Sequence, residues 1–132
     1  MEDTATFGGF LKEKRQSKNI SLRKFAELAG ISPVYMCNME KDRNPAPSEE
    51  VLNRMVKLLL LTEEETARFF DLAAKSKKIP AVSQDLPAYI MDRDIVRVAL
   101  RTAKDVDATD EEWQAFIAML EAKRKAGQEE PQ

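Results

Sequence analysis

The chain has 132 residues, of which 33% are charged and only four are glycine. This composition predicts an all-helical protein of one or two small domains with one modest core. Histidine is absent, which removes the commonest general base and the commonest zinc ligand, and a single cysteine allows no internal disulfide. We therefore predict no catalytic, metal or cofactor site, and we expect a reducing, cytoplasmic setting.

Membrane insertion is also not predicted. The longest leucine run, at positions 58–61, is far too short to cross a bilayer and is interpreted as core, and we recognise no signal peptide.

The net charge of −2 hides an asymmetry between the two halves of the chain. Residues 7–47 hold eight Lys and Arg against four Asp and Glu, a balance of +4. Residues 85–132 hold seven against eleven, a balance of −4. An anion-binding surface is therefore expected in the N-terminal half.

Three short helices are predicted first, over about residues 7–18, 22–29 and 33–41. Ser21 caps the second helix, Gly30 ends it, and Ser32 caps the third helix, in which Pro33 takes the first position. Met36 and Met39 then face the core. Two helices joined by such a tight turn hold the second one out at an angle, which suits the major groove of DNA.

Two further helices follow an extended loop at residues 42–47, which Pro45 and Pro47 keep out of helical geometry. Ser48 caps one of them, and Thr62 with Glu65 forms a capping box for the other. A change of character then marks residues 77–87 as a linker, so that the first domain covers residues 1–76.

The last third of the chain, residues 88–127, is predicted as a helical extension. One or two short helices follow Pro87, and a capping box of Thr109 and Glu112 opens a final helix that ends at Gly127, before a disordered tail at 128–132. This helix carries an apolar stripe that is either intramolecular core or a dimer face: Trp113, Phe116, Ile117 and Leu120.

Residues 7–73 resemble the helix-turn-helix domain of the lambda-repressor-like (XRE) family of bacterial and phage regulators. The resemblance is carried by about a dozen positions: Ile20-Ser21, Phe25-Ala26, Gly30-Ile31-Ser32, Tyr35-Met36, Met39-Glu40, Arg43-Asn44-Pro45 and Pro47-Ser48. It implies a five-helix DNA-binding domain, followed here by the small helical extension. It also implies a partly buried ion pair between Arg15 and Glu40, which fixes the angle of the recognition helix.

The resemblance assigns DNA contacts to two sets of residues. The base-contacting set, in which Asn38 can pair with adenine and Val34 can press on a thymine methyl group, is Pro33, Val34, Tyr35, Cys37 and Asn38. The phosphate-contacting set is Ser21, Arg23, Lys24, Ser32, Lys41, Arg43 and Asn44.

Each of these assignments has a plainer alternative. The basic side chains are otherwise solubilising surface charge, Tyr35 is otherwise core, and Cys37 is otherwise a small filler on the helix. Two positions also depart from the family: Leu22 replaces the usual Gln, and the recognition face around Val34 is unusually apolar, which favours readout of apolar groups or DNA shape.

Sequence-specific transcriptional regulation is the leading hypothesis, as a repressor of its own operon or of a mobile element, acting as a homodimer on a palindromic operator of double-stranded DNA. The alternative is the antitoxin of a toxin–antitoxin pair, whose C-terminal helices bind the toxin. A metalloprotease that cleaves the repressor is a further partner that the resemblance allows. The third hypothesis is a protein-interaction module that has lost DNA binding.

Overall fold

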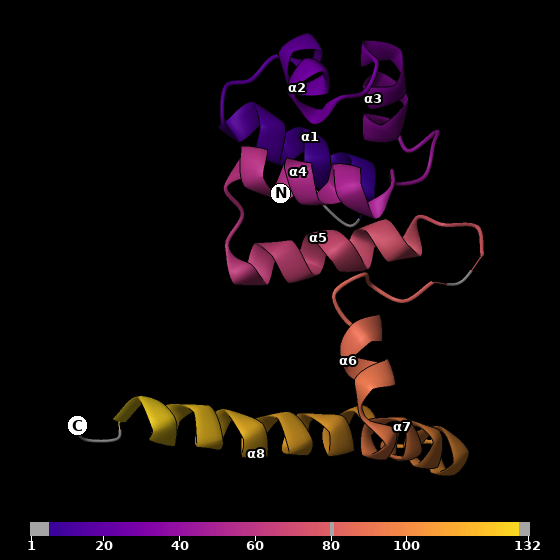
Figure 1. Ribbon diagram of the computed structural model, residues 1–132, viewed down its shortest axis with the longest axis vertical. Coiled ribbons are helices and arrows are strands. Elements are labelled where there is room, and N and C mark those ends of the chain that lie inside the picture. The colour runs from indigo at the N-terminus through magenta and orange to yellow at the C-terminus, as the bar shows by residue number, and fades with distance from the viewer. Residues whose placement is uncertain (1–5, 80, 130–132) are drawn as a thin grey trace. The chain divides into compact units, whose positions relative to one another are not determined.

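The computed structural model describes residues 6–79 and 81–129, which form two units divided between Tyr89 and Ile90. The described residues contain helices and no strand. The first unit holds α1 (Phe7–Ser17), α2 (Leu22–Ala29), α3 (Pro33–Glu40), α4 (Glu49–Leu59) and α5 (Glu63–Lys75) (Figure 1). The all-helical fold and the five N-terminal helices are as the sequence predicts, with ends that differ by one residue in α1 and α3.

The helix ends follow the predicted caps. The hydroxyls of Ser21, Ser32, Ser48 and Thr62 each accept a backbone N–H from the first turn of the helix that they begin. The capping box of α5 is complete, because Glu65 also accepts the N–H of Thr62. The Lys14 ammonium, 2.8 Å from the Glu65 carboxylate, and this N–H together hold the pKa of that carboxyl below its usual range.

The core of the first unit is built around Phe69 of α5. Its ring is fully buried and lies 5.1 Å from the ring centroid of Phe7 and 5.7 Å from that of Phe10, so that it joins α5 to α1. α1 also packs against α3, and α2 packs against α3 and α4. As predicted, α3 contributes Met36 and Met39, both with no exposed surface.

The leucine run at 58–61 is only partly core, which corrects the interpretation above. Leu59 is fully buried, but Leu60 is 72% exposed and adopts left-handed backbone geometry at φ 54°, where it ends α4. Because α4 ends at Leu59, the chain turns at Leu60 and the run does not present one continuous face to the core.

The segment predicted as a linker, residues 77–87, is held against the first unit. Ser83 is buried and its hydroxyl donates to the Asp71 carboxylate of α5, while Gln84 donates to the Asn53 side chain of α4 at 2.9 Å. Lys77 donates to the carbonyl of Ala46. The part of this segment at residue 80 lies outside the described residues.

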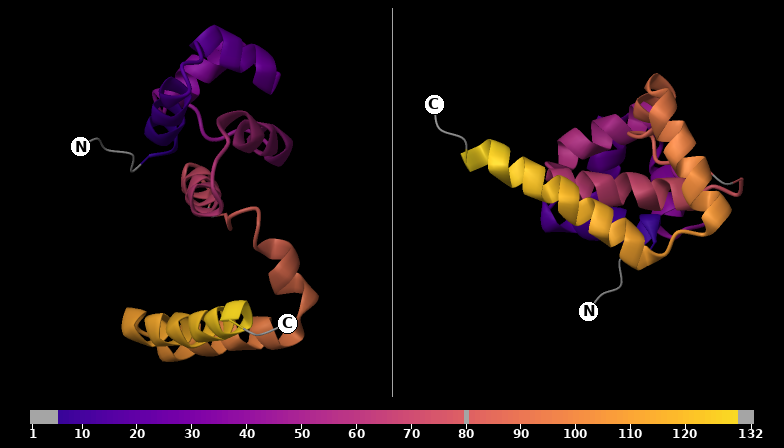
Figure 2. Two further views of the ribbon diagram at one scale, coloured as in Figure 1. Left: turned by 90° about the vertical axis from the view of Figure 1, so that its left-hand side faces the viewer. Right: turned by 90° about the horizontal axis from the view of Figure 1, so that it is seen from below.

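The second unit contains the end of α6 (Pro87–Asp92), then α7 (Asp94–Val106) and α8 (Asp110–Glu129). α7 and α8 diverge from the short turn that joins them (Figure 2). α8 opens with the predicted capping box of Thr109 and Glu112. It runs through Gly127 to Glu129, past the predicted end, and the remainder of the predicted disordered tail, residues 130–132, lies outside the described residues.

Gly8 allows α1 to approach the end of α3 closely. A Cβ atom built on Gly8 would lie 2.4 Å from the carbonyl oxygen of Met39 and 2.6 Å from that of Glu40. The backbone N–H of Gly8 donates to the Asp42 carboxylate at 2.9 Å. The local sequence does not predict this packing role of Gly8, because the two carbonyls belong to residues more than 30 positions away.

We predict that Gly8→Ala lowers the free energy of unfolding by about 1–3 kcal/mol, because backbone oxygens that α1 and α3 fix in place must move to admit a methyl group. Thermal denaturation followed by circular dichroism measures the change. Gly127→Ala is the matched control, since a Cβ there meets nothing within 4 Å. Equal melting temperatures for Gly8→Ala and the unmodified chain would contradict the packing role.

Candidate nucleic-acid interface

The turn between α2 and α3 sets how α3 leaves the bundle. Gly30 adopts the left-handed conformation, with φ 81°, and the N–H groups of Gly30 and Ile31 both donate to the Ala26 carbonyl, at 2.9 and 3.0 Å. The Ser32 hydroxyl then accepts the N–H of Tyr35, which starts α3 immediately after the turn. A three-residue connection of this kind leaves α3 little freedom relative to α2.

The two faces of α3 differ sharply in exposure. Met36 and Met39 are fully buried, whereas Val34 is 71% exposed and Pro33, Tyr35, Cys37 and Asn38 are partly exposed. All five predicted base-contacting residues therefore retain surface on the part of α3 that the core does not cover. The thiol of Cys37 is partly exposed and unpaired.

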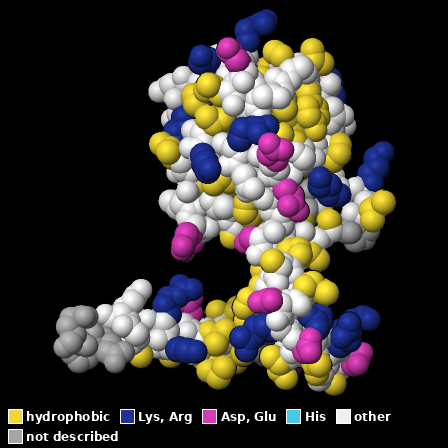
Figure 3. Space-filling model, in the orientation of Figure 1, with side chains coloured by type: hydrophobic (Ala, Val, Ile, Leu, Met, Phe, Trp, Pro, Cys, Tyr) yellow, Lys and Arg dark blue, Asp and Glu magenta, His cyan; other side chains and the backbone are white. Residues whose placement is uncertain are grey.

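The predicted phosphate-contacting residues surround α3 on three segments. Ser21, Arg23 and Lys24 lie at the start of α2, Ser32 caps α3, and Lys41, Arg43 and Asn44 follow α3. All are exposed except Asn44, which is partly exposed. The Lys24 ammonium lies 4.0 Å from the Glu27 carboxylate, a surface pair of little strength. Figure 3 shows basic and hydrophobic side chains sharing the end of the unit that α2 and α3 occupy.

The loop after α3 is fixed in place. Asp42 takes left-handed geometry at φ 59°, which Asp tolerates better than most residues, and its side chain caps α1 through Gly8. The N–H groups of Arg43 and Asn44 both donate to the Asn38 carbonyl, at 2.9 and 3.4 Å. Farther along, the N–H of Ala46 donates to the Ser76 hydroxyl at 2.8 Å. Arg43 and Asn44 therefore extend from an ordered backbone.

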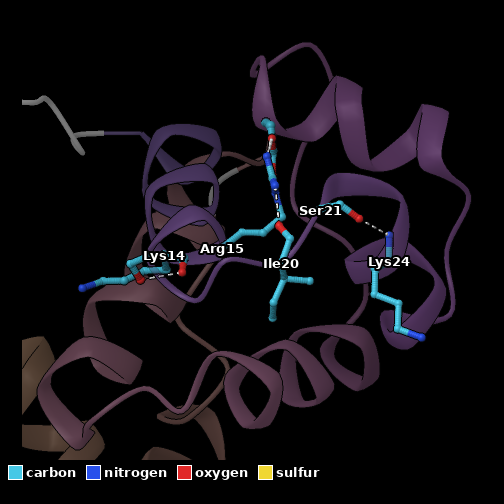
Figure 4. Close-up of polar contacts among 7 residues, drawn as sticks. Lys14, Arg15, Ile20, Ser21 and Lys24 are labelled. Carbon is cyan, nitrogen blue, oxygen red and sulfur yellow. Dashed lines mark hydrogen bonds and ion pairs between the residues drawn. The ribbon is translucent and has the colours of Figure 1, made fainter.

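Arg15 and Glu40 are brought together as a buried pair. The guanidinium donates to both carboxylate oxygens of Glu40, at 2.6 and 3.0 Å, and both side chains are less than a tenth exposed. Its remaining nitrogen, Nη1, donates to the Ile20 carbonyl at 2.7 Å (Figure 4). One side chain of α1 thus contacts the end of α3 and the residue before the cap of α2.

Two further residues position the interface: the sequence pattern did not identify Arg54, and it identified Leu22 only as a departure from the family. Arg54 of α4 donates from Nε to the carbonyl of Ala29, the last residue of α2, at 3.0 Å, and its guanidinium lies beside Gly30. Leu22, which replaces the Gln usual in the family, is partly buried and packs against the core. Each relationship depends on a contact that the local sequence around it does not reveal.

Comparisons with known proteins agree with this geometry over the first unit. A family model described as a helix-turn-helix domain matches residues 6–69. Two relatives from two strains of Mycobacterium tuberculosis, each named an uncharacterized HTH-type transcriptional regulator, are 32% identical over 57 residues, which is 43% of this chain and 40% of each relative. The chain therefore matches less than half the length of these relatives.

Among solved structures, the complex of SinR protein and SinI protein has a TM-score of 0.46 and 17% identity, over 91% of this chain and 99% of that chain. No helix within the described residues is long and apolar enough to cross a membrane. The helix-turn-helix match over residues 6–69 covers the capped helices, the glycine turn and the Arg15–Glu40 ion pair, so the N-terminal part of this chain is similar to helix-turn-helix domains.

Proposed function

We propose that the chain is a sequence-specific DNA-binding transcriptional regulator whose α3 enters the major groove. The supporting observation is the exposure of α3: Met36 and Met39 anchor one face, and Val34, Cys37 and Asn38 retain surface on the rest. A short helix held at a fixed angle by a glycine turn and a buried ion pair suits the width of the groove.

Base readout is assigned to the first two turns of α3. The amide of Asn38 can exchange two hydrogen bonds with adenine, and Val34 offers an apolar surface to a thymine methyl group. Arg23, Lys24, Lys41 and Arg43 flank these residues and are suited to the phosphates on either side. With so few cations, sequence-independent binding is expected to be weak and to depend on salt.

A homodimer on a palindromic operator follows from the small size of this interface. One domain that reads DNA through two helical turns makes too few contacts for tight binding, and a two-fold pair doubles them. Such a dimer places its half-sites about one helical turn of DNA, about 34 Å, apart. Occupation of promoter DNA then represses transcription without any chemical step, most directly at the operon of the protein itself.

The operator is obtained by selecting bound fragments from genomic DNA with the purified chain. We predict that Val34→Glu and Asn38→Glu each weaken binding to the selected fragment by at least about tenfold, because each removes a base contact and adds a negative charge beside phosphates. Fluorescence anisotropy at fixed salt measures the dissociation constant.

Ala67→Glu on the exposed surface of α5 is the matched control for charge and helix propensity, and should bind like the unmodified chain. Fragments without a shared sequence, or unchanged affinity in both α3 variants, would refute the assignment of α3 to base readout.

Arg15→Ala is predicted to reduce stability and DNA affinity together, because Glu40 is left buried without its partner and the Ile20 carbonyl loses its donor. Loss of one partner of a buried pair costs about 3–5 kcal/mol. Denaturant unfolding and anisotropy, the latter at a temperature where the variant is folded, measure the two effects.

Removing both charges separates the two contributions. Arg15→Met with Glu40→Met should recover part of the stability, since no unpaired charge remains, but should bind DNA less well than the unmodified chain. Lost affinity with an unchanged melting temperature in Arg15→Ala would show that Arg15 does not act by orienting α3.

A further inference from the structure

The second unit leaves its apolar side chains without an internal core. No described residue from Ile90 onward is buried, and α7 and α8 diverge instead of packing along their length (Figure 2). On α8, Phe116, Ile117 and Leu120 are 46%, 53% and 46% exposed. Trp113 is partly exposed and its ring lies edge-on to Phe116 at 6.2 Å. Helices with such stripes gain stability by burying them against another surface.

One face of α8 has a charged residue at each end of its apolar stripe. Asp110, Trp113, Ile117, Leu120 and Arg124 follow one another at alternating steps of three and four residues. At about 100° per residue these five positions fall within an arc of about 80°. Asp110 and Arg124 each lie seven residues from Ile117, a distance of about 10.5 Å along the helix axis.

The wider charge pattern of α8 is divided in the same way. Its first turn carries Asp110, Glu111 and Glu112, and its later part carries Lys123, Arg124 and Lys125, with Glu121 in an exposed pair 3.6 Å from Arg124. The helix dipole favours acidic residues near the start of a helix and basic residues near its end, so it accounts for the signs of these charges within a single helix. The dipole does not account for an exposed apolar stripe between them, whereas a partner helix of opposite direction accounts for both.

We propose that α8 pairs with α8 of a second copy of this chain, antiparallel, about a two-fold axis near Ile117. In this arrangement each Asp110 faces Arg124 of the partner, and Trp113, Ile117 and Leu120 form the shared apolar seam. A parallel pair would instead place acid against acid and base against base. The inference rests on the homodimer proposed above and names its pairing segment and direction, but it does not depend on DNA binding.

Cross-linking of the full chain without DNA tests the direction of the pair. In a Cys37→Ser background, Asp110→Cys and Arg124→Cys are prepared as separate proteins, mixed under reducing conditions and then oxidised gently. We expect disulfide-linked dimers from the mixture and almost none from either protein alone. Dimers from each protein alone would indicate a parallel pair and overturn the proposal.

Charge exchange tests the same contact by affinity. Sedimentation equilibrium should show that Arg124→Asp raises the dimer dissociation constant at least about tenfold, since two repulsive pairs form per dimer. Asp110→Arg with Arg124→Asp should restore it to within about threefold. Lys125→Asp makes the same charge change about 100° away on the helix and is the matched control. No rescue by the double exchange would overturn the pairing of Asp110 with Arg124.

The apolar seam is tested by Ile117→Glu against Ala118→Glu, with helix content checked by circular dichroism. We expect the first to abolish the dimer and the second, which lies off the stripe, to leave it nearly intact. A monomeric unmodified chain would refute the proposal and the homodimer, while a dimer insensitive to Ile117→Glu would refute only the pairing through α8. Neither result tests whether α3 reads bases, which the α3 variants measure separately by anisotropy.

Discussion

The geometry of the first unit depends on the side chain of Arg15. Its guanidinium contacts Glu40 near the end of α3 and the carbonyl of Ile20 immediately before α2, so one residue of α1 fixes both helices of the motif. The pair is almost wholly buried, and a buried ion pair adds little net stability compared with apolar side chains of similar volume. The pair instead fixes the orientation of α3. A bidentate contact between guanidinium and carboxylate allows only a narrow range of angles between the two groups, whereas an apolar contact does not restrict them.

The helices and turns were predictable because their signals are local. Ser21, Ser32, Ser48 and Thr62 act within three residues of their partners, and Gly30 is required by the backbone at its own position. The position of Arg15 opposite Glu40 came from the family resemblance, not from spacing. For the DNA contacts, the family resemblance supplied candidates, and every one of them keeps some exposed surface.

What could not be predicted depends on residues far apart in the chain. Gly8 is needed because the carbonyls of Met39 and Glu40 approach it, and Ser83 is buried because Asp71 of α5 accepts its hydroxyl. Leu60 is exposed because it follows the last residue of α4, where left-handed backbone geometry turns it away from the core. Helix propensity and local periodicity do not predict these contacts, because the contacts depend on how the helices pack against one another.

The two units differ in how much of their apolar surface is buried. The first has a buried apolar core, and its α3 is short and mostly uncharged, so one copy is expected to gain little affinity for DNA. The second buries none of its described residues. Gln84 is hydrogen-bonded to Asn53 of α4, and the second unit starts at Ile90. Only residues 85–89 therefore separate Gln84 from the second unit. If α8 pairs as proposed, the dimer keeps two copies of α3 at a high local concentration, so that apolar surface exposed in one unit offsets the weak contacts of the other.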